Sequence, residues 1–324
     1  MLRWGVMGTG NIAHQFVRDA YHGRGGKFVG VYSRNQSSAE AFAKEFGLPH
    51  AFSDLDAFLA SPDIDVVYVA SPHTSHVEQG LALIDAGKAA LVEKPVAVNV
   101  ADAEKLYRRS QETGVFCQEA FWTRFNPVYQ QILKQARDGR LGALRFGQAN
   151  FGFRSPSDPQ HRLNNPDLAG GALLDIGLYP LILTLDLFGE PADIDGRVTL
   201  GDSGVDRSAD LVLSYANGER CAVHYSIDYE LPQTALISGE RGWVELQSLW
   251  FAPNSARWQV GGGPVQVEHY PLLGKGYHYE FTATNEAIAA GRLDCAEHTQ
   301  ADSLTLMRLL DRIRNQWGPR YPFE

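Results

Sequence analysis

The stretch Met1–Ala13, MLRWGVMGTGNIA, decides the fold that we predict for this chain of 324 residues. Apolar side chains from Leu2 to Val6 suit a buried strand, the glycines Gly8 and Gly10 suit a turn, and an amphipathic run follows. Strand, glycine turn and helix, in this order, make the first βα unit of a dinucleotide-binding domain. The alternative is an ordinary glycine-rich turn.

The turn has the small residues that an approaching pyrophosphate requires. Gly8 permits a tight turn, and Gly10 has no Cβ, so the backbone can come close to a pyrophosphate at the helix N-terminus, where N–H groups favour negative charge. Ala13 replaces the third glycine of the G-x-G-x-x-G pattern and still permits close packing of helix on strand. We expect this turn to bind a cofactor at Gly8, Thr9, Gly10, Asn11 and Ile12.

Length and composition limit the classes of protein to which the chain can belong. At roughly 150 residues per domain, 324 residues suggest two domains. A net charge of -9 gives no electrostatic case for binding nucleic acid or an anionic membrane. Cys117, Cys221 and Cys295 lack metal-like spacing and indicate buried thiols in a reducing compartment. No apolar run approaches the ~18 residues of a membrane span, and the N-terminus leaves no room for a signal peptide, so we expect a cytoplasmic protein.

The rest of the first 121 residues alternates strands and helices, which implies an α/β fold with a doubly wound parallel sheet. The expected strands are Lys27–Ser33, Val66–Ala70, Ala90–Val92 and Val115–Glu119. The expected helices are Ser38–Phe46, Ser53–Leu59 with Ser53 as its N-cap, Ser75–Ala86 and Val100–Thr113.

The end of the second expected strand indicates which cofactor is bound. An acidic residue usually holds the ribose 2′-hydroxyl of NAD at this place. Here Ser33 and Arg34 stand there instead, and a hydroxyl with a bidentate guanidinium suits a 2′-phosphate. We therefore predict NADP, with NAD as the alternative. In that second case Arg34 would stack on the adenine or point to solvent.

Polar residues also follow two later strands at the carboxyl edge of the sheet, where ligands bind in such folds. Ser71, Pro72 and His73 follow one strand, and Glu93-Lys94-Pro95 follows the next. A lysine at the end of a buried strand can donate to a substrate oxygen or lower the pKa of a neighbouring acid. The alternative is a surface lysine in a loop.

The first half of the chain contains the stretches GTGNIA, VYSRN, SPHTSH and LVEKPVAVN. At these spacings they resemble the glucose-fructose oxidoreductase/inositol dehydrogenase (Gfo/Idh/MocA) family, and the resemblance covers the whole chain. The resemblance implies an NAD(P)-dependent oxidoreductase with a Rossmann domain (residues 1–121) and a C-terminal α/β substrate domain (residues 122–324). The second domain would be built on a large, mostly antiparallel open sheet that often forms the subunit interface. Further cofactor contacts are then expected at Ser71, Pro72, His73, His76, Glu93 and Lys94, with His73 at the nicotinamide ribose.

A second motif lies in the apolar run that ends at Phe188. Asp175 and Tyr179 are four residues apart and share a helix face, where they are either satisfied in the core or exposed to a polar cleft. In the family the pattern D-x-G-x-Y carries the catalytic tyrosine, so the resemblance implies Tyr179 as acid/base and Lys94 as its electrostatic partner. We expect Asp175 at the catalytic site as well, where it would orient the substrate or a loop. A nearby ammonium favours the phenolate of a tyrosine, whose pKa is otherwise ~10.

Tyrosine at this position, where many family members have histidine, argues against an inositol dehydrogenase. It favours the branch with dihydrodiol dehydrogenase and NADP-linked D-xylose dehydrogenase, to which EAFWTRFNP is also similar. In that branch aromatic residues line the substrate cavity. The substrate contacts that we expect are Trp122, Arg124, Phe151 or Phe153, Arg154 and His161, the last two on substrate hydroxyls.

Short strands with turn signals occupy residues 193–267, and Asn217-Gly218 is a strong hairpin signal. They predict an antiparallel sheet with one face on helices. Four aromatic residues would make its other face an apolar patch, which predicts a homodimer or homotetramer through this sheet. These residues are Trp243, Trp250, Phe251 and Trp258. Other expected elements are helices 128–138, 279–290 and 301–317 and strand 144–153.

The sequence thus predicts an NADP-dependent oxidoreductase for a small carbohydrate-like substrate, either a pyranose at C1 or a related cyclic diol. The alternative is a cofactor-binding sensor or regulator on the same fold, which would not need both Lys94 and Tyr179. The histidines include only one close pair, His73 and His76, and no further ligands complete it, so no metal is expected.

Overall fold

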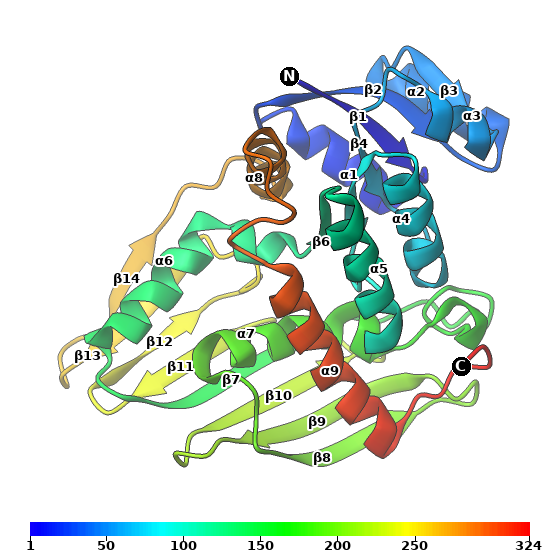
Figure 1. Cartoon of the computed structure of the whole chain (residues 1–324). Helices are drawn as coiled ribbons and strands as arrows, with labels where there is room; N and C mark the ends of the chain where they lie inside the picture. The colour runs from blue at the N-terminus through cyan, green and yellow to red at the C-terminus, as the bar shows by residue number, and fades with distance from the viewer. The chain divides into compact units, whose positions relative to one another are not determined.

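The computed structural model describes all 324 residues, which form two compact units (Figure 1). The first unit contains residues 1–125 and 273–304, and the second contains residues 126–272 and 305–324. The first unit therefore includes a late segment in addition to the expected Rossmann residues. The assignment of cofactor binding to residues 1–121 and substrate binding to residues 122–324 stays a prediction.

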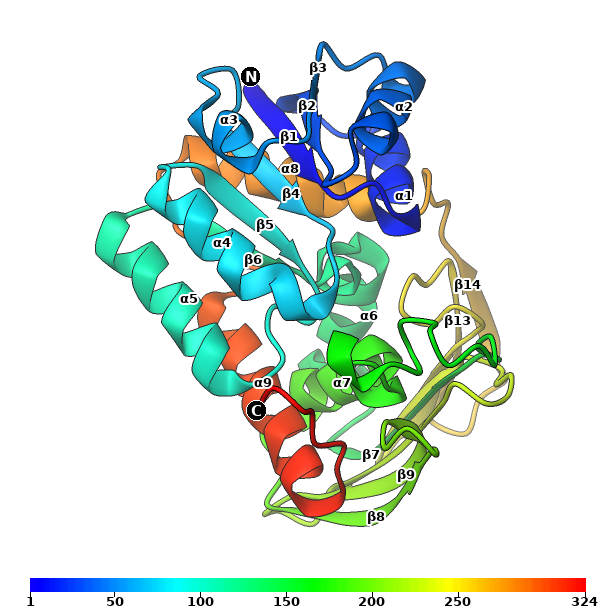
Figure 2. The same cartoon turned by 90° about the vertical axis from the view of Figure 1, so that its right-hand side faces the viewer.

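The first unit is built on a six-stranded parallel sheet with the order β3-β2-β1-β4-β5-β6, which confirms the doubly wound fold. Its strands are β1 (Leu2–Met7), β2 (Gly26–Tyr32), β3 (His50–Phe52), β4 (Val66–Val69), β5 (Ala89–Glu93) and β6 (Cys117–Ala120). Its helices are α1 (Asn11–Ala20), α2 (Gln36–Phe46), α3 (Leu55–Ala60), α4 (His76–Asp85), α5 (Val100–Thr113), α8 (Tyr277–Ala289) and the start of α9 (Gln300–Trp317). Figure 2 shows α4 and α5 side by side on one face of this sheet, with α8 behind it.

Helix α3 begins later than predicted. Asp54, not Ser53, is its N-cap, because the Asp54 side chain accepts a hydrogen bond from the N–H of Ala57. Both residues are of a type that caps helices, so the sequence alone did not distinguish them. Helix α2, in contrast, begins two residues earlier than predicted, at Gln36, with Asn35 as its N-cap, whose side chain accepts from the N–H of Ser38.

The late segment joins the first unit through an aromatic core. Trp4 of β1 packs 4.8 Å from Phe281 of α8, centroid to centroid, and its indole N–H donates to the Asn285 side chain at 2.9 Å. Phe16 of α1 stacks on Tyr68 of β4 at 3.8 Å. Helix α8 therefore completes the core on the α1 side of the sheet.

The second unit is built on an eight-stranded sheet with the order β14-β13-β12-β11-β7-β10-β9-β8. All neighbouring pairs are antiparallel except β7 and β10, so the prediction of a mostly antiparallel sheet is confirmed. The strands are β7 (Leu144–Gly152), β8 (Asp193–Leu200), β9 (Asp206–Ser214), β10 (Arg220–Ser226), β11 (Ala235–Gly239), β12 (Gly242–Leu246), β13 (Ser255–Val260) and β14 (Gln266–His269). The Asn217-Gly218 hairpin joins β9 to β10 as predicted.

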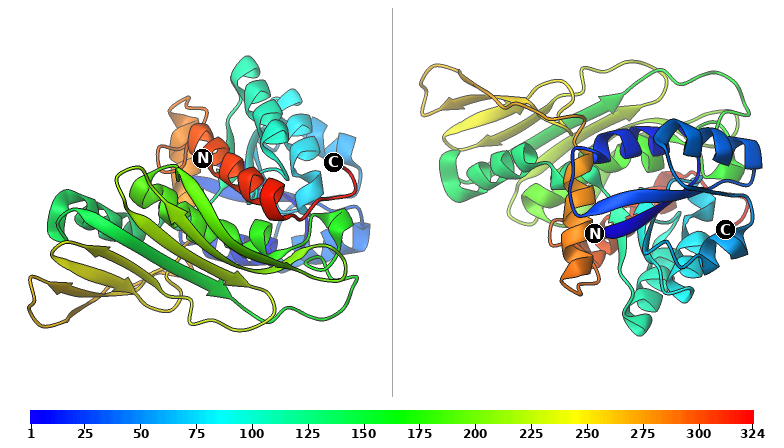
Figure 3. Two further views of the ribbon diagram at one scale, coloured as in Figure 1. Left: turned by 90° about the horizontal axis from the view of Figure 1, so that it is seen from below. Right: turned by 90° about the horizontal axis from the view of Figure 1, so that it is seen from above.

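Helices cover one face of the eight-stranded sheet, and the left-hand view of Figure 3 shows the other face without a helix. The helices are α6 (Pro127–Gln135), α7 (Leu178–Phe188) and most of α9. Two π-helical turns accompany them, η3 (Ala136–Arg140) and η5 (Leu173–Gly177). Turn η5 runs directly into α7.

The prediction of an apolar patch formed by four aromatic residues was wrong. Trp250, Phe251 and Trp258 are buried in the single chain, and Trp243 is half-buried. The Trp250 indole N–H donates to the Asn150 carbonyl at 2.9 Å, and the Arg140 guanidinium lies 3.8 Å from the centre of the Trp258 ring. These rings therefore give no support to an oligomer interface, and the oligomer stays a prediction.

The segment Pro166–Phe188 corrects the statement that no apolar run approaches a membrane span. Its 23 residues include an 18-residue window of mean hydropathy 1.7, which is long and apolar enough to cross a membrane by length and composition. However, 89% of that window is buried in the structure, and Ala169 (φ 53°) and Gly171 (φ 123°) interrupt the helical path. Its apolar composition is accounted for by burial in the protein core.

Candidate active site

The glycine turn between β1 and α1 has the geometry that cofactor binding requires. Gly8 has φ +109°, and a Cβ there would lie 2.6 Å from the Ala70 carbonyl oxygen, so only glycine fits. Gly10 is the N-cap of α1 and makes no side-chain cap, and a Cβ on it would meet no atom within 4 Å. The protein itself therefore does not require glycine at position 10, whereas a ligand approaching the helix N-terminus would.

Ser33 and Arg34 follow β2 at the same edge of the sheet. The Gly8 N–H donates to the Tyr32 carbonyl at 2.9 Å, which joins the glycine turn to the end of β2. The Ser33 hydroxyl accepts from the Asn35 N–H at 3.3 Å, and the Arg34 side chain is exposed. Asn11 is exposed, and Thr9 and Ile12 are half-buried. The turn and this arginine are therefore accessible at one edge, as a 2′-phosphate-bearing cofactor would need.

His76 joins the loops after β4 and β5. It is fully buried, and its Nδ1 and Nε2 atoms lie 2.8 Å and 2.9 Å from the carbonyl oxygens of Pro95 and Ser71. Burial lowers the pKa of His76, although both carbonyl contacts oppose the shift. The His76 ring thus lies between the two loops, and its predicted contact with the cofactor stays a prediction. His73 lies 5.8 Å from it, ring to ring, and no group of three metal-ligating side chains is found in the structure.

Glu93 fixes the backbone at Lys94. It is buried at the end of β5, and its carboxylate accepts hydrogen bonds from the Tyr68 hydroxyl and, at 3.1 Å, from the Lys94 N–H. Lys94 is half-buried at the carboxyl edge of the sheet, where the motif predicted it. Glu93 therefore helps to fix the position of the Lys94 backbone.

Two substrate contacts predicted near residue 122 are held inside the first unit. The Trp122 ring packs 4.7 Å from the Tyr277 ring. The Arg124 guanidinium donates to His298 Nδ1 at 2.9 Å and lies 3.3 Å from the Asp302 carboxylate. Part of the Arg124 side chain therefore has a structural role that the sequence did not indicate.

Glu119 links this arginine to the lysine loop. Its carboxylate is fully buried and accepts from His298 Nε2 at 2.8 Å, from the Ser303 hydroxyl at 2.5 Å and from the Val96 N–H at 2.9 Å. Sequence reasoning missed Glu119 and His298 because 179 residues separate them. The only signal was a carboxylate at the end of an expected buried strand.

Tyr179 lies in the first turn of α7 within a group of three aromatic rings in the second unit. Its ring lies 5.4 Å from both Phe151 and Phe251, and those two rings stack at 4.5 Å with an interplanar angle of 5°. Only 5% of Tyr179 is exposed. Phe151 was predicted for the substrate cavity, but Phe251 was placed wrongly on the outer face of the sheet.

Asp175 lies in η5, one turn before Tyr179. It is 6% exposed, and its carboxylate pairs with the Arg162 guanidinium at 3.1 Å. Sequence reasoning missed this arginine, which stands next to the predicted His161. π-Helical turns are frequent at functional sites, which agrees with the motif here.

The remaining predicted substrate residues lie on the segment after β7. Phe153 and His161 are half-buried and Arg154 is exposed. The Arg154 N–H donates to Glu230 at 3.3 Å, and His161 Nδ1 accepts from the Leu163 N–H at 3.4 Å. These contacts fix the local backbone.

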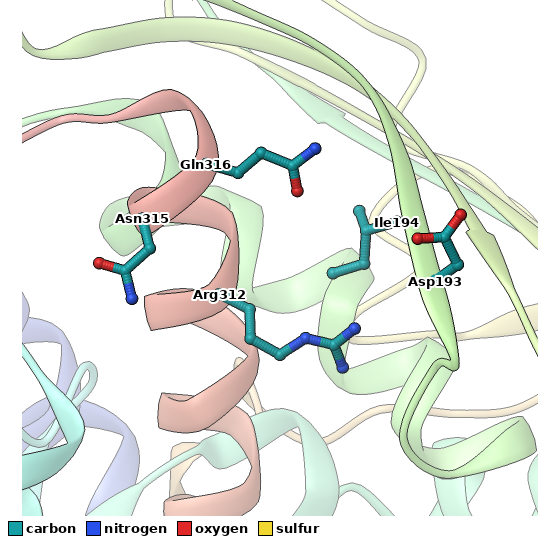
Figure 4. Close-up of a pocket in the computed structure, with 5 residues that line it drawn as sticks. All are labelled: Asp193, Ile194, Arg312, Asn315 and Gln316. Atoms are coloured by element: carbon teal, nitrogen blue, oxygen red, sulfur yellow. The ribbon is translucent and has the colours of Figure 1, made fainter.

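A pocket on the second unit is lined by none of the predicted residues (Figure 4). Its lining residues are Asp193, Ile194, Arg312, Asn315 and Gln316. The Arg312 guanidinium donates to the Pro191 carbonyl at 2.9 Å, so it fastens α9 to the start of β8.

Two family models match the chain. The model described as "Oxidoreductase family, NAD-binding Rossmann fold" matches residues 2–121, and the "GFO/IDH/MocA C-terminal domain" model matches residues 129–245. The chain belongs to the Gfo/Idh/MocA family. It is therefore an NAD(P)-dependent oxidoreductase, as predicted.

Relatives of this Gfo/Idh/MocA protein match over almost its full length. The trans-1,2-dihydrobenzene-1,2-diol dehydrogenase of Mus musculus is 32% identical and the match covers 99% of this chain and 98% of that one. The NADP(+) scyllo-inositol 2-dehydrogenase of Bacillus subtilis (strain 168) is 30% identical with 99% of both chains covered. The aldose-aldose oxidoreductase of Caulobacter crescentus shares the fold, with a TM-score of 0.88 at 24% identity over 97% of this chain and 96% of that one.

These relatives confirm the resemblance to the dihydrodiol dehydrogenase branch. They do not support the argument that Tyr179 separates this chain from inositol dehydrogenases, because one relative carries that name. A single residue type was too little to exclude that substrate class.

The buried carboxyl group of Glu280 gives a first testable prediction. Glu280 of α8 is fully buried and neither carboxyl oxygen has a hydrogen-bond partner. Burial raises its pKa well above the ordinary value, and the charges of Glu93 and Asp19 add to the shift. Because the folded chain must then hold a proton that the unfolded chain releases, stability falls as pH rises above about 4.5, by about 1.4 kcal/mol per pH unit.

Glu280→Gln removes this proton uptake. We expect the variant to be more stable than the wild type, with an advantage in urea unfolding that grows as pH rises above about 4.5. Glu286→Gln, on the exposed side of the same helix, is the control and should change little. Parallel pH curves for Glu280→Gln and the wild type would show that Glu280 is ionised in the folded protein.

Proposed function

We propose that the protein is an NADP-dependent oxidoreductase that transfers a hydride between nicotinamide and a C–OH or C=O carbon of a sugar, at pyranose C1, or of a related cyclic diol. The proposal rests on Tyr179, the tyrosine of the D-x-G-x-Y sequence. Its phenol is nearly buried against the rings of Phe151 and Phe251. The names of the relatives, a dihydrodiol and an inositol dehydrogenase, support the substrate class.

The residues of the first unit fit the cofactor. Gly8 and Gly10 would let the pyrophosphate reach the N-terminus of α1, and Ser33 with Arg34 would bind the 2′-phosphate. The loops at His73 and Glu93 would complete the site at the carboxyl edge of the sheet. NADP, when bound, supplies or accepts the hydride.

The residues of the chain would move the proton. Oxidation of an alcohol requires a base for the hydroxyl proton, and the Tyr179 oxygen would take it as phenolate and return it in the reverse direction. The resemblance implies that the Lys94 ammonium is its electrostatic partner, which favours the phenolate near neutral pH.

The surroundings of Tyr179 suit a cyclic substrate. The stacked rings of Phe151 and Phe251 offer an apolar surface to the C–H face of a ring and exclude water from the phenol. Asp175, held by Arg162, would orient the start of α7. Arg154 and His161 would bind hydroxyl groups of the substrate.

Arg34→Ala tests the cofactor preference. Loss of a charge-assisted contact with the 2′-phosphate should weaken NADPH binding by about 10- to 100-fold and leave NADH binding nearly unchanged. The measurement is a fluorescence titration with each cofactor. Arg24→Ala is a matched control, because Arg24 is an exposed arginine that precedes β2 at the opposite end of that strand. Equal losses for both cofactors, or a wild-type preference for NADH, would refute the assignment of NADP.

A substrate screen tests the reaction itself. Aldoses, inositols and cyclic trans-diols are offered with NADP+, and absorbance of NADPH is followed. Turnover of one of these classes is expected. Tight NADPH binding without turnover of any polyol would instead favour the sensor or regulator.

A further inference from the structure

Asp206 is a fully buried carboxyl group that the proposed reaction does not use. It begins β9, and its Oδ2 accepts a hydrogen bond of 2.6 Å from the Leu173 N–H. Leu173 is the first residue of η5, the turn that carries Asp175 and leads into α7. Asp206 is therefore bonded to the N-terminal end of the segment on which Asp175 and Tyr179 lie.

The chain is shaped around this carboxyl group. Gly171 has φ +123°, and a Cβ there would lie 2.1 Å from Asp206 Oδ1, so the glycine makes the approach possible. A Cβ on Gly177, at the other end of η5, would lie 2.9 Å from the Tyr225 ring. Two strands of the sheet, β9 and β10, thus hold the two ends of the turn through Asp206 and Tyr225.

We propose that Asp206 is a positioning residue, which holds η5 in place through Leu173 and so sets the position of Asp175 and Tyr179. The inference rests on the proposed function of Tyr179. A carboxylate at a helix N-terminus binds the free N–H groups and is favoured by the helix dipole, so loss of the acceptor would loosen the first turns.

The charge state of Asp206 gives this role a pH dependence. Burial raises the pKa of Asp206 to about 7, although the N–H groups of Leu173 and Ala172 and the charge of Arg314 on α9 oppose the shift. The other titratable groups that face it are the hydroxyls of Tyr225 on β10 and Tyr321 in the C-terminal segment.

Two oxygens at this carboxyl group, Asp206 Oδ1 and the neighbouring Tyr225 hydroxyl, are buried without a hydrogen-bond partner. A charge on Asp206 is therefore only partly compensated, and its ionisation occurs within the pH range in which the enzyme would be assayed. Since the folded pKa lies above the ordinary value, Asp206 makes stability fall as pH rises from about 4 to about 7, and no further above that.

The experiment compares Asp206→Ala, which removes the acceptor, with Asp206→Asn, which keeps it without charge. Three quantities are measured on the full chain: kcat with a substrate found in the screen, the Kd for NADPH, and hydrogen exchange of the peptide 171–179. We expect Asp206→Ala to lower kcat and to speed exchange in this peptide, each by about tenfold, with an unchanged Kd. Asp206→Asn, which corresponds to the protonated side chain, should match the wild type in both below about pH 7.

The pH profile is the readout that a merely structural role would not change. The wild-type kcat/KM should show an inflection near pH 7 that Asp206→Asn lacks, and the Tm of Asp206→Asn relative to the wild type should rise between about pH 4 and about pH 7. If Asp206→Ala does not fold, these Asp206→Asn profiles decide the question alone. Profiles that coincide with the wild type, or wild-type kcat in Asp206→Ala, overturn the proposal.

Failure of the proposed function would be seen separately. If Tyr179→Phe kept its turnover while Asp206→Ala loosened residues 171–179 and lowered kcat, Tyr179 would not be the acid/base. Asp206 would still position the reacting segment.

Discussion

Tyr179→Phe is expected to lower kcat by about 10²- to 10⁴-fold, the usual contribution of a general acid/base. The substitution removes only the hydroxyl group and leaves the ring to pack on Phe151 and Phe251. The far-UV spectrum and the unfolding midpoint should therefore stay close to the wild type. NADPH affinity should also be unchanged, because the glycine turn belongs to the first unit.

Tyr215→Phe is the matched control, since Tyr215 is another buried tyrosine of the second unit, after β9. It should retain nearly full turnover. Lys94→Met extends the test: without the ammonium, the rising limb of the pH profile should move to higher pH, because the phenolate forms less readily. Near-wild-type turnover of Tyr179→Phe would remove the tyrosine from the mechanism.

The Rossmann part of the fold could be predicted because its signals are local. The first strand, turn and helix lie within residues 1–20, and each later strand is a short apolar run followed by a polar edge. Strand β3 was missed because its three residues, His50–Phe52, are too few to show a period. The parallel order of strands then follows from the alternation of elements.

The contribution of α8 to the first unit could not be predicted. It depends on contacts between residues far apart in the chain, such as Trp4 and Asn285, which 281 residues separate. The burial of Trp250 and Phe251 was missed for a related reason. Alternation within a strand indicates which residues share a face, but not which loop covers that face.

In the candidate site, too, residues in local patterns could be predicted, and contacts between distant residues could not. Motifs located Lys94, Asp175 and Tyr179, because each stands in a characteristic local pattern. The residues that hold them, Glu119 and Asp206, have no motif, and only the fold brings them to the backbone near Lys94 and Tyr179.

Glu119→Ala is expected to have the largest effect on stability. It leaves the Val96 N–H, the Ser303 hydroxyl and the His298 Nε2–H buried without their acceptor, and each such donor costs about 1–3 kcal/mol. A guanidinium can only donate, so Arg124 requires His298 Nδ1 to accept, and His298 Nε2–H then donates to Glu119. Urea unfolding measures the loss.

The pH dependence separates the charge of Glu119 from its packing. Burial alone would raise the pKa of Glu119, but the hydrogen bonds that the carboxylate accepts from His298, Ser303 and the Val96 N–H hold it below the ordinary value. A depressed pKa means that the carboxylate stabilises the fold above about pH 4.5 and loses this effect as pH falls further. Glu119→Gln should therefore be less stable than the wild type at neutral pH, and the difference should shrink on acidification.

Exposed Glu112→Gln on α5 is the control and should show neither effect. Val96 is two residues from Lys94, so release of its N–H in Glu119→Ala should also lower turnover, while Glu112→Gln remains active. A stability difference that does not change with pH would mean that Glu119 acts through packing alone, and unaltered turnover would mean that the Val96 bond does not position the lysine.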